Sequence, residues 1–155
     1  MNSKFDTTLV KRPHLSEKYT TDQIQDISKC IQNPVYFINN FCYIQHPVKG
    51  RVRFNLYDFQ ERLVDTYNNY RYAIALLPRQ TGKSTAAAAY LLWYAMFKPD
   101  SVILIAAHKY AGAFEIMQRV RYIYETLPDF IRSGCTSYNR GSIEFENGSR
   151  IVSQA

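Results

Sequence analysis

Two stretches of the chain are apolar at almost every position, and each is followed by a helical pattern. Residues 72–77 ("YAIALL") and 101–107 ("SVILIAA") predict buried strands of a parallel sheet, because such strands are covered on both faces. The segments 83–97 and 111–127 have the composition and the apolar spacing of helices. The order strand, helix, strand, helix predicts a right-handed parallel α/β unit.

The chain before this unit begins with polar residues and then turns helical. Residues 1–19 have no hydrophobic period and predict a loose arm. Thr20 and Gln23 stand at the spacing of a capping box and predict the start of a helix. Asn33-Pro34 predicts its end.

Shorter elements complete the pattern on both sides of the unit. Residues 34–40 predict a second short helix with proline at its first position, and residues 42–56 predict two strands around a turn. The segment 57–70 predicts an amphipathic helix. Residues 142–153 predict a hairpin around Asn147-Gly148, since this dipeptide favours tight turns.

The composition of the chain favours a polyanionic binding partner. The chain has 155 residues, of which 46% are hydrophobic, so it can build a core. Its 19 Lys and Arg against 13 Asp and Glu give a net charge of +6, which suits nucleic acid or nucleotide but also an ordinary basic protein. The three cysteines show no metal or disulfide spacing, which favours a reduced, intracellular chain. The longest apolar stretch, 86–97, is too short to span a bilayer.

The clearest candidate chemistry lies between the first apolar run and its helix. Gly82, Lys83 and Ser84 match the end of the Walker A pattern, in which backbone N–H groups surround phosphates, lysine neutralises them and the hydroxyl binds Mg²⁺. The first glycine of the pattern is replaced by Leu77. The alternative is a solvated lysine on a first helical turn, where the positive end of the helix dipole disfavours a cation.

A second candidate is Gln60, on the helix before the first apolar run. A carboxamide can bond N6 and N7 of adenine. The alternative is an exposed helical glutamine without a ligand, and taken alone the residue favours that interpretation.

Four segments together resemble the large terminase subunit of tailed bacteriophages, particularly its T4-like type. They are "FQERLV", "LLPRQTGKST", "ILIAAHK" and "LPDFIRSG…NRGSIEFENGSRI". The similarity covers roughly residues 56–155, and more weakly the chain back to about residue 33. The Arg-Gln-x-Gly-Lys-Ser-Thr form of the loop is characteristic of this family, whose members often lack the first glycine.

The resemblance implies a role for each matching residue. Arg79 matches a loop arginine proposed to act in catalysis as a finger on the γ-phosphate, and Gln60 matches a glutamine that contacts adenine. Ser84 is the expected contact to Mg²⁺ through the nucleotide. The residues expected to bind ATP and Mg²⁺ are Gln60, Gln80, Thr81, Gly82, Lys83, Ser84 and Thr85. His108 and Lys109 match positions that often face the ligand or DNA.

The family's fold is an α/β P-loop NTPase of the ASCE type, with a parallel sheet and flanking helices. We expect an arm and short helix over residues 1–32, and the N-terminal portion of the ATPase domain over 33–155, ending before the Walker B strand with a C-terminal β-hairpin. The Walker B aspartate, the catalytic glutamate and the nuclease carboxylates are not found in the sequence. Unpaired apolar strand edges would make the chain poorly stable without a complementary polypeptide.

The resemblance implies the ATP-binding part of a motor that moves double-stranded DNA into the phage procapsid. The implied partners are DNA, the portal and the small terminase subunit, in a homo-oligomeric ring in the host bacterial cytoplasm and without a membrane. Two alternatives stay open. One is a helicase-like translocase fragment, because helicases also place a glutamine before the Walker strand. The other is a non-catalytic remnant that binds nucleotide or a partner.

Overall fold

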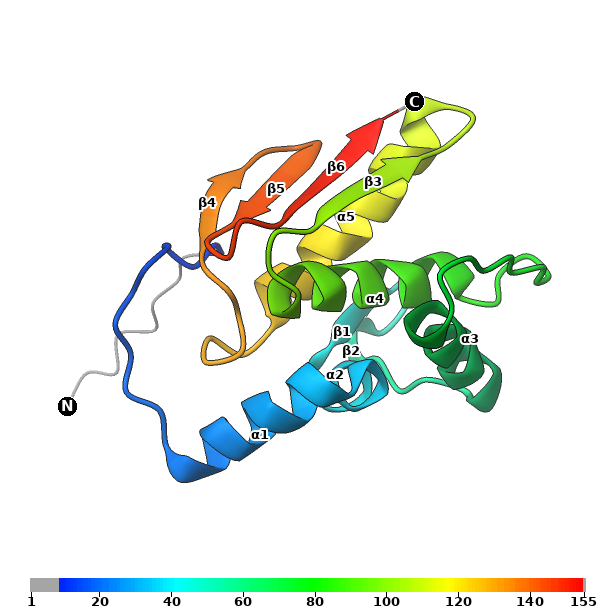
Figure 1. Cartoon of the computed structure of the whole chain (residues 1–155). Coiled ribbons are helices and arrows are strands. Elements are labelled where there is room, and N and C mark those ends of the chain that lie inside the picture. The colour runs from blue at the N-terminus through cyan, green and yellow to red at the C-terminus, as the bar shows by residue number, and fades with distance from the viewer. Residues whose placement is uncertain (1–8, 155) are drawn as a thin grey trace.

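The computed structural model describes residues 9–154, which form a mixed α/β fold (Figure 1). Its elements are α1 (Thr21–Gln32), α2 (Pro34–Phe41), β1 (Tyr43–His46), β2 (Gly50–Arg53), α3 (Asp58–Asn69), α4 (Lys83–Phe97), β3 (Val102–Ala106), α5 (Tyr110–Thr126), β4 (Cys135–Tyr138), β5 (Ser142–Phe145) and β6 (Arg150–Gln154). The predicted helices are all present. None of the helices in this part of the chain is long and apolar enough to cross a membrane.

The larger sheet differs from the expected parallel one. Its four strands have the order β3-β6-β5-β4, and only β3 and β6 are parallel. β5 runs antiparallel to both of its neighbours, so the sheet is mostly antiparallel and the predicted parallel P-loop sheet is not confirmed. Strand β6, the second strand of the β5–β6 hairpin, lies beside β3. Ile151 of β6 is fully buried opposite Ile103 of β3, and this apolar pair stabilises the contact between the two strands.

The predicted strand at 72–77 is wrong. Ile74 is 99% exposed and Leu76 is 96% exposed. Within residues 9–154, this segment pairs with no strand. An apolar run becomes a buried strand only where neighbouring strands supply hydrogen bonds and other elements cover its faces. Within residues 9–154 no strand lies beside the segment, whereas the helix and strand predicted after it are present as α4 and β3.

Helix α4 lies at the centre of the core. Its buried side chains are distributed around the whole helix, so it is packed on more than one side. Trp93 is 1% exposed, and its indole nitrogen donates a hydrogen bond to the Cys30 carbonyl of α1 at 2.6 Å. Figure 1 shows α4 between α1–α3 on one side and α5 with the larger sheet on the other. The helix that carries the candidate loop is thus held from both sides.

The N-terminal segment is irregular but not loose where the structure describes it. Lys11 is 7% exposed, and its ammonium donates to Glu17 at 2.7 Å and to the Asp129 carbonyl at 2.9 Å. The backbone N–H of His14 donates to Glu146 at 2.6 Å. Residues 10–14 therefore pack against the chain near β4 and β5, and the prediction of a loose arm is wrong there. The first eight residues of that arm lie outside the described residues.

The C-terminal hairpin is confirmed. Gly148 has φ +85°, a conformation that side chains with a Cβ rarely adopt, and it joins the antiparallel strands β5 and β6. The Asn147 amide donates to the carbonyls of Ala95 and Met96, which fixes the turn to the end of α4. Strand β4 was not predicted. All three cysteines are buried and free of disulfide bonds.

Candidate nucleotide-phosphate site

Residues 78–82 form the loop that leads into α4. In its second half, residues with a positive φ angle alternate with one whose φ is not positive. Gln80 has φ +63° and Gly82 has φ +74°, whereas Thr81 between them has no positive φ. The Thr81 hydroxyl donates to the Pro78 carbonyl at 3.0 Å and closes the turn. Alternation of this kind points successive backbone N–H groups to one side, which is the geometry of an anion-binding concavity. The loop therefore has a shape suited to phosphate.

Lys83 folds back across this loop. Its ammonium donates to the Leu77 carbonyl at 2.9 Å and to the Pro78 carbonyl at 3.3 Å. Leu77 occupies the position of the first Walker glycine, so the lysine side chain reaches back across the loop to the residue that precedes it. No acidic side chain forms an ion pair with Lys83 in the described part of the chain. A cation on a first helical turn without a counter-ion is unfavourable, and a bound anion would remove that disadvantage.

Gln60 lies directly behind the loop. It is 3% exposed, its amide nitrogen donates to the Thr81 carbonyl at 2.9 Å, and its amide oxygen accepts from the Tyr57 backbone N–H at 3.0 Å. A Cβ on Gly82 would lie 2.6 Å from that amide nitrogen, so the close approach requires glycine. The interpretation of Gln60 as an exposed helical glutamine is wrong. The adenine contact stays a prediction, since the amide keeps one N–H and one lone pair free of these two bonds.

Ser84 and Thr85 lie half-buried on the first turn of α4. Gly82 is the N-cap of this helix, and its carbonyl accepts the first intrahelical bond from the Ala86 N–H at 2.9 Å. The preceding N–H groups of this turn have no intrahelical acceptor, and together with the helix dipole they favour an anion. Arg79 is exposed in the loop. All the predicted loop residues thus lie around one helix N-terminus, with Gln60 behind them.

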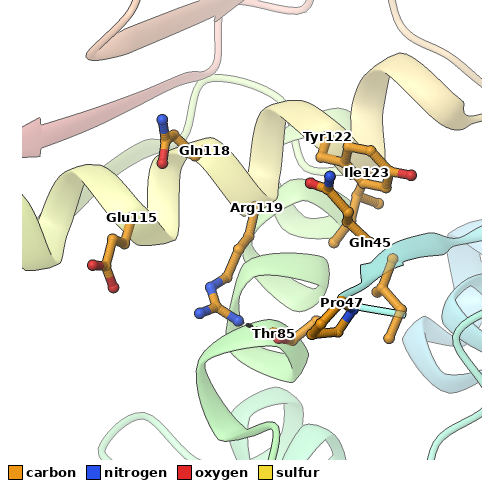
Figure 2. Close-up of a pocket in the computed structure, with 9 residues that line it drawn as sticks. Gln45, Pro47, Thr85, Glu115, Gln118, Arg119, Tyr122 and Ile123 are labelled. Atoms are coloured by element: carbon orange, nitrogen blue, oxygen red, sulfur yellow. Dashed lines mark hydrogen bonds between the residues drawn. The ribbon is translucent and has the colours of Figure 1, made fainter. Parts of the chain in front are cut away.

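A cavity of about 410 Å³ adjoins this turn and was not predicted (Figure 2). Its lining comes from β1 and the turn that follows it, from Thr85, and from one face of α5. Arg119 of α5 donates to the Thr85 hydroxyl at 2.8 Å. No sequence pattern indicates this bond, because the two residues lie 34 positions apart. Arg119 is therefore a candidate site residue that only the fold identifies.

Two other arginines of the C-terminal half make local contacts away from Thr85. Arg121 lies 3.9 Å from Glu125 and over the Tyr138 ring, while Arg132 pairs with Asp129 at 2.6 Å. These residues are occupied by local contacts. His108 and Lys109 are exposed between β3 and α5, and no hydrogen bond joins either to the loop in the described part of the chain. Their predicted contact with ligand or DNA stays a prediction.

Fold and site together define a mixed α/β protein with a candidate anion-binding loop at the start of its central helix. A family model described as the N-terminal part of the T4-like type of large terminase subunit matches residues 74–155, which is more than half of the chain. The chain belongs to this family. The match includes the loop, α4, β3, α5 and the C-terminal hairpin, but it begins after Gln60. Membership indicates a role in the packaging of phage DNA in the host cell, with DNA and packaging proteins as partners in general.

Proposed function

We propose that the chain binds ATP with Mg²⁺ at residues 78–85 and serves a motor that moves double-stranded DNA into the phage procapsid. The observation that carries the proposal is the position of Lys83, whose ammonium is held inside the loop by two carbonyls and by no carboxylate of the described residues. Family membership and the left-handed Gly82 support it. The Leu77 and Pro78 carbonyls keep the side chain extended across the loop until phosphate replaces them.

Each loop residue receives a role that follows from its place. Lys83 donates to the terminal phosphates, and the backbone N–H groups of Gln80, Thr81 and Gly82 donate to phosphate oxygens at the helix N-terminus. Ser84 supplies a hydroxyl to the Mg²⁺ that accompanies the nucleotide. Arg79, exposed at the loop, is placed by the proposal on the γ-phosphate during hydrolysis.

Gln60 has a supporting role in this proposal. Its two hydrogen bonds join the start of α3 to the Thr81 carbonyl, and it fills the space behind Gly82. It therefore keeps the loop open in the shape that binds phosphate. The predicted adenine contact would use the remaining N–H and lone pair of the same amide.

The motor partners belong to the same proposal. The net charge of +6 suits contact with DNA, which carries closely spaced phosphates. The phage portal, the small terminase subunit and a homo-oligomeric ring are the assembly in which a packaging subunit of this family acts. The T4-like family match favours this function over a helicase-like translocase.

The test is a calorimetric titration of the purified chain with Mg·ATP beside two lysine variants. Lys83→Ala should weaken binding by roughly 1.5–3 kcal/mol, because a charge-assisted contact is lost. Lys98→Ala is the matched control, since Lys98 is an exposed lysine at the opposite end of the same helix. Equal affinity of the unaltered chain and Lys83→Ala would contradict the proposal.

A further inference from the structure

We infer that the exposed face of the β1–β2 hairpin binds the phosphate backbone of DNA through Arg51 and Arg53. The inference rests on the proposed function in one respect, since it takes DNA as the molecule that is moved. It does not depend on nucleotide binding. Family membership indicates DNA as a partner in general, but the matched residues, 74–155, do not include this hairpin. The inference adds the surface that makes the contact.

The strand pairing places both arginines on one side of the hairpin. Arg51 and Arg53 alternate with Val52 along β2, so their side chains point to the same side. Tyr43 of β1 is the direct partner of Arg53 and therefore shares this side. Both arginines are exposed, whereas Val52 is half-buried. Tyr43, Arg51 and Arg53 together are called the basic face below.

Contacts with Tyr43 hold the two guanidinium groups in place. The guanidinium carbon of Arg51 lies 4.1 Å from the centroid of the Tyr43 ring, and that of Arg53 lies 5.7 Å from it. Arg51 also donates to the Thr126 carbonyl at the end of α5 at 3.2 Å, and Arg53 reaches the Tyr43 hydroxyl at 3.5 Å. A guanidinium that lies over a ring keeps its N–H groups at its edge, where a phosphate can accept from them.

The turn of the hairpin is also fixed and carries a third cation. The ring nitrogen Nδ1 of His46 accepts hydrogen bonds from the backbone N–H groups of Val48 and Lys49, both at 3.2 Å. Gly50 has φ +70°, which allows the chain to enter β2 directly after the turn. The Lys49 side chain is exposed beside the start of β2. The strand that carries Arg51 and Arg53 is therefore anchored at its start.

No acidic residue of this region offsets the charge. Residues 27–57 contain no Asp or Glu. Within residues 9–154, neither Arg51 nor Arg53 forms an ion pair, whereas Arg121 and Arg132 each have a carboxylate partner. Cations that lie close together repel one another, and a polyanion removes this repulsion while it releases its own counter-ions. The basic face is thus available to phosphates in a way that the paired arginines are not.

The same hairpin also reaches the first turn of α4. Gln45, the partner of Arg51 across the strands, lines the cavity beside Thr85 together with Pro47 (Figure 2). Glu115 of α5 lines this cavity as well, but it forms no ion pair with the hairpin in the described part of the chain. DNA on the basic face would therefore lie one strand away from residues that border the candidate phosphate loop.

DNA fits the basic face better than an acidic protein segment does. Arg51 and Arg53 are two residues apart on a strand, which separates their Cα atoms by about 6.6 Å. Double-stranded DNA carries one charge for about every 1.7 Å of its axis, so neighbouring cations on a rigid strand find phosphates without a matching sequence. An acidic peptide can also bind guanidinium groups, but the family's role in DNA packaging favours DNA.

The experiment measures the binding of a fluorescent DNA duplex of mixed sequence to the full chain by anisotropy, between about 50 and 200 mM salt. The logarithm of the affinity should fall linearly with the logarithm of the salt concentration, by about 0.9 for each phosphate contact. Arg51→Gln combined with Arg53→Gln should make this slope shallower by about 1.8 and weaken binding at least about tenfold near 100 mM salt.

Two further double variants make the result specific. Arg51→Lys combined with Arg53→Lys keeps both charges and should retain most of the slope, which separates loss of charge from loss of the hairpin. Arg71→Gln combined with Lys98→Gln is the matched control, because each of these exposed cations also lies over an aromatic ring. The slope of this control should equal that of the unaltered chain.

The outcomes separate this inference from the proposed function. If the unaltered chain binds the duplex and the Arg51→Gln, Arg53→Gln variant shows the same slope, DNA contacts another surface and only the inference is overturned. Competition by poly-glutamate as strong as that by unlabelled duplex of equal charge would assign the face to an acidic protein segment and overturn it too. If the unaltered chain binds no duplex, the inference fails with the DNA part of the proposed function, while the Mg·ATP titration tests the loop separately.

Discussion

The candidate loop joins two apolar segments that differ greatly in burial. Helix α4, after the loop, buries Ala88, Leu92 and Trp93 almost completely. The segment 72–77, before the loop, exposes nearly all of Ile74 and Leu76. Both have the composition of core elements. The difference shows that burial follows from partners, since α4 satisfies its own hydrogen bonds and finds packed neighbours, whereas an extended segment depends on adjacent strands for both.

The largest expected effect tests this comparison by paired truncations. Trp93→Ala should lower the free energy of unfolding by about 3–5 kcal/mol, because it opens a cavity in the core and removes the bond to the Cys30 carbonyl. Leu76→Ala should change it by no more than about 0.5 kcal/mol, as for an exposed site. Urea denaturation of both variants provides the measurement. Similar losses in the two variants would show that 72–77 is buried in solution.

A smaller effect is expected behind the loop. Gln60→Ala removes two hydrogen bonds and should lower stability by about 1–3 kcal/mol, since it leaves a buried N–H and carbonyl without partners. Gln23→Ala is a matched control, because Gln23 makes the same kind of capping bond, to the Thr20 N–H, at the exposed start of α1. Its loss should be about 0.5–1 kcal/mol. Thermal denaturation of the two variants decides whether Gln60 is a specific support of the loop.

Comparison of these regions also shows what a sequence can predict. The start of α1, its end at Asn33 and the turn at Gly148 follow from short-range chemistry, and all three are present. The predicted strand at 72–77 failed because its burial depends on other strands. Strand β4, "CTSY", lacks apolar alternation and is held through its pairing with β5. Such pairings are determined by tertiary structure.

The candidate site, like the fold, could be predicted from the sequence only in part. The loop residues are contiguous and carry a motif, so they were predicted from the sequence. The hydrogen bond from Gln60 to Thr81 spans 21 positions, and the bond from Arg119 to Thr85 spans 34. No pattern in the sequence indicates either contact. Only the fold shows that Gln60 is buried behind the loop and that Arg119 reaches Thr85 on the first turn of α4.

The smallest expected effect concerns the N-terminal segment and its dependence on pH. Burial alone would raise the pKa of Glu146, but the N–H groups of His14 and Gly134 donate to its carboxylate and, with the nearby charges of His14 and Lys11, lower that pKa below its ordinary value. A lowered folded-state pKa adds stability above the ordinary glutamate pKa of about 4.3, and this stability is lost as pH falls through the folded-state value.

Glu146→Gln should therefore be less stable than the unaltered chain at about pH 6, and the two should converge toward about pH 3. Urea midpoints measured across this range provide the comparison. A stability difference that stays constant with pH would mean that the carboxylate charge does not hold residues 10–14 in place.

Hydrogen exchange with and without excess Mg·ATP tests the central claim most directly. The account predicts that amides of residues 80–85 exchange more slowly when Mg·ATP is present, because their N–H groups then donate to phosphate oxygens. Amides of 72–77 should exchange rapidly in both conditions, since no strand of the described chain pairs with them. Exchange of the loop amides at the same rate with and without Mg·ATP would contradict a phosphate site at the start of α4.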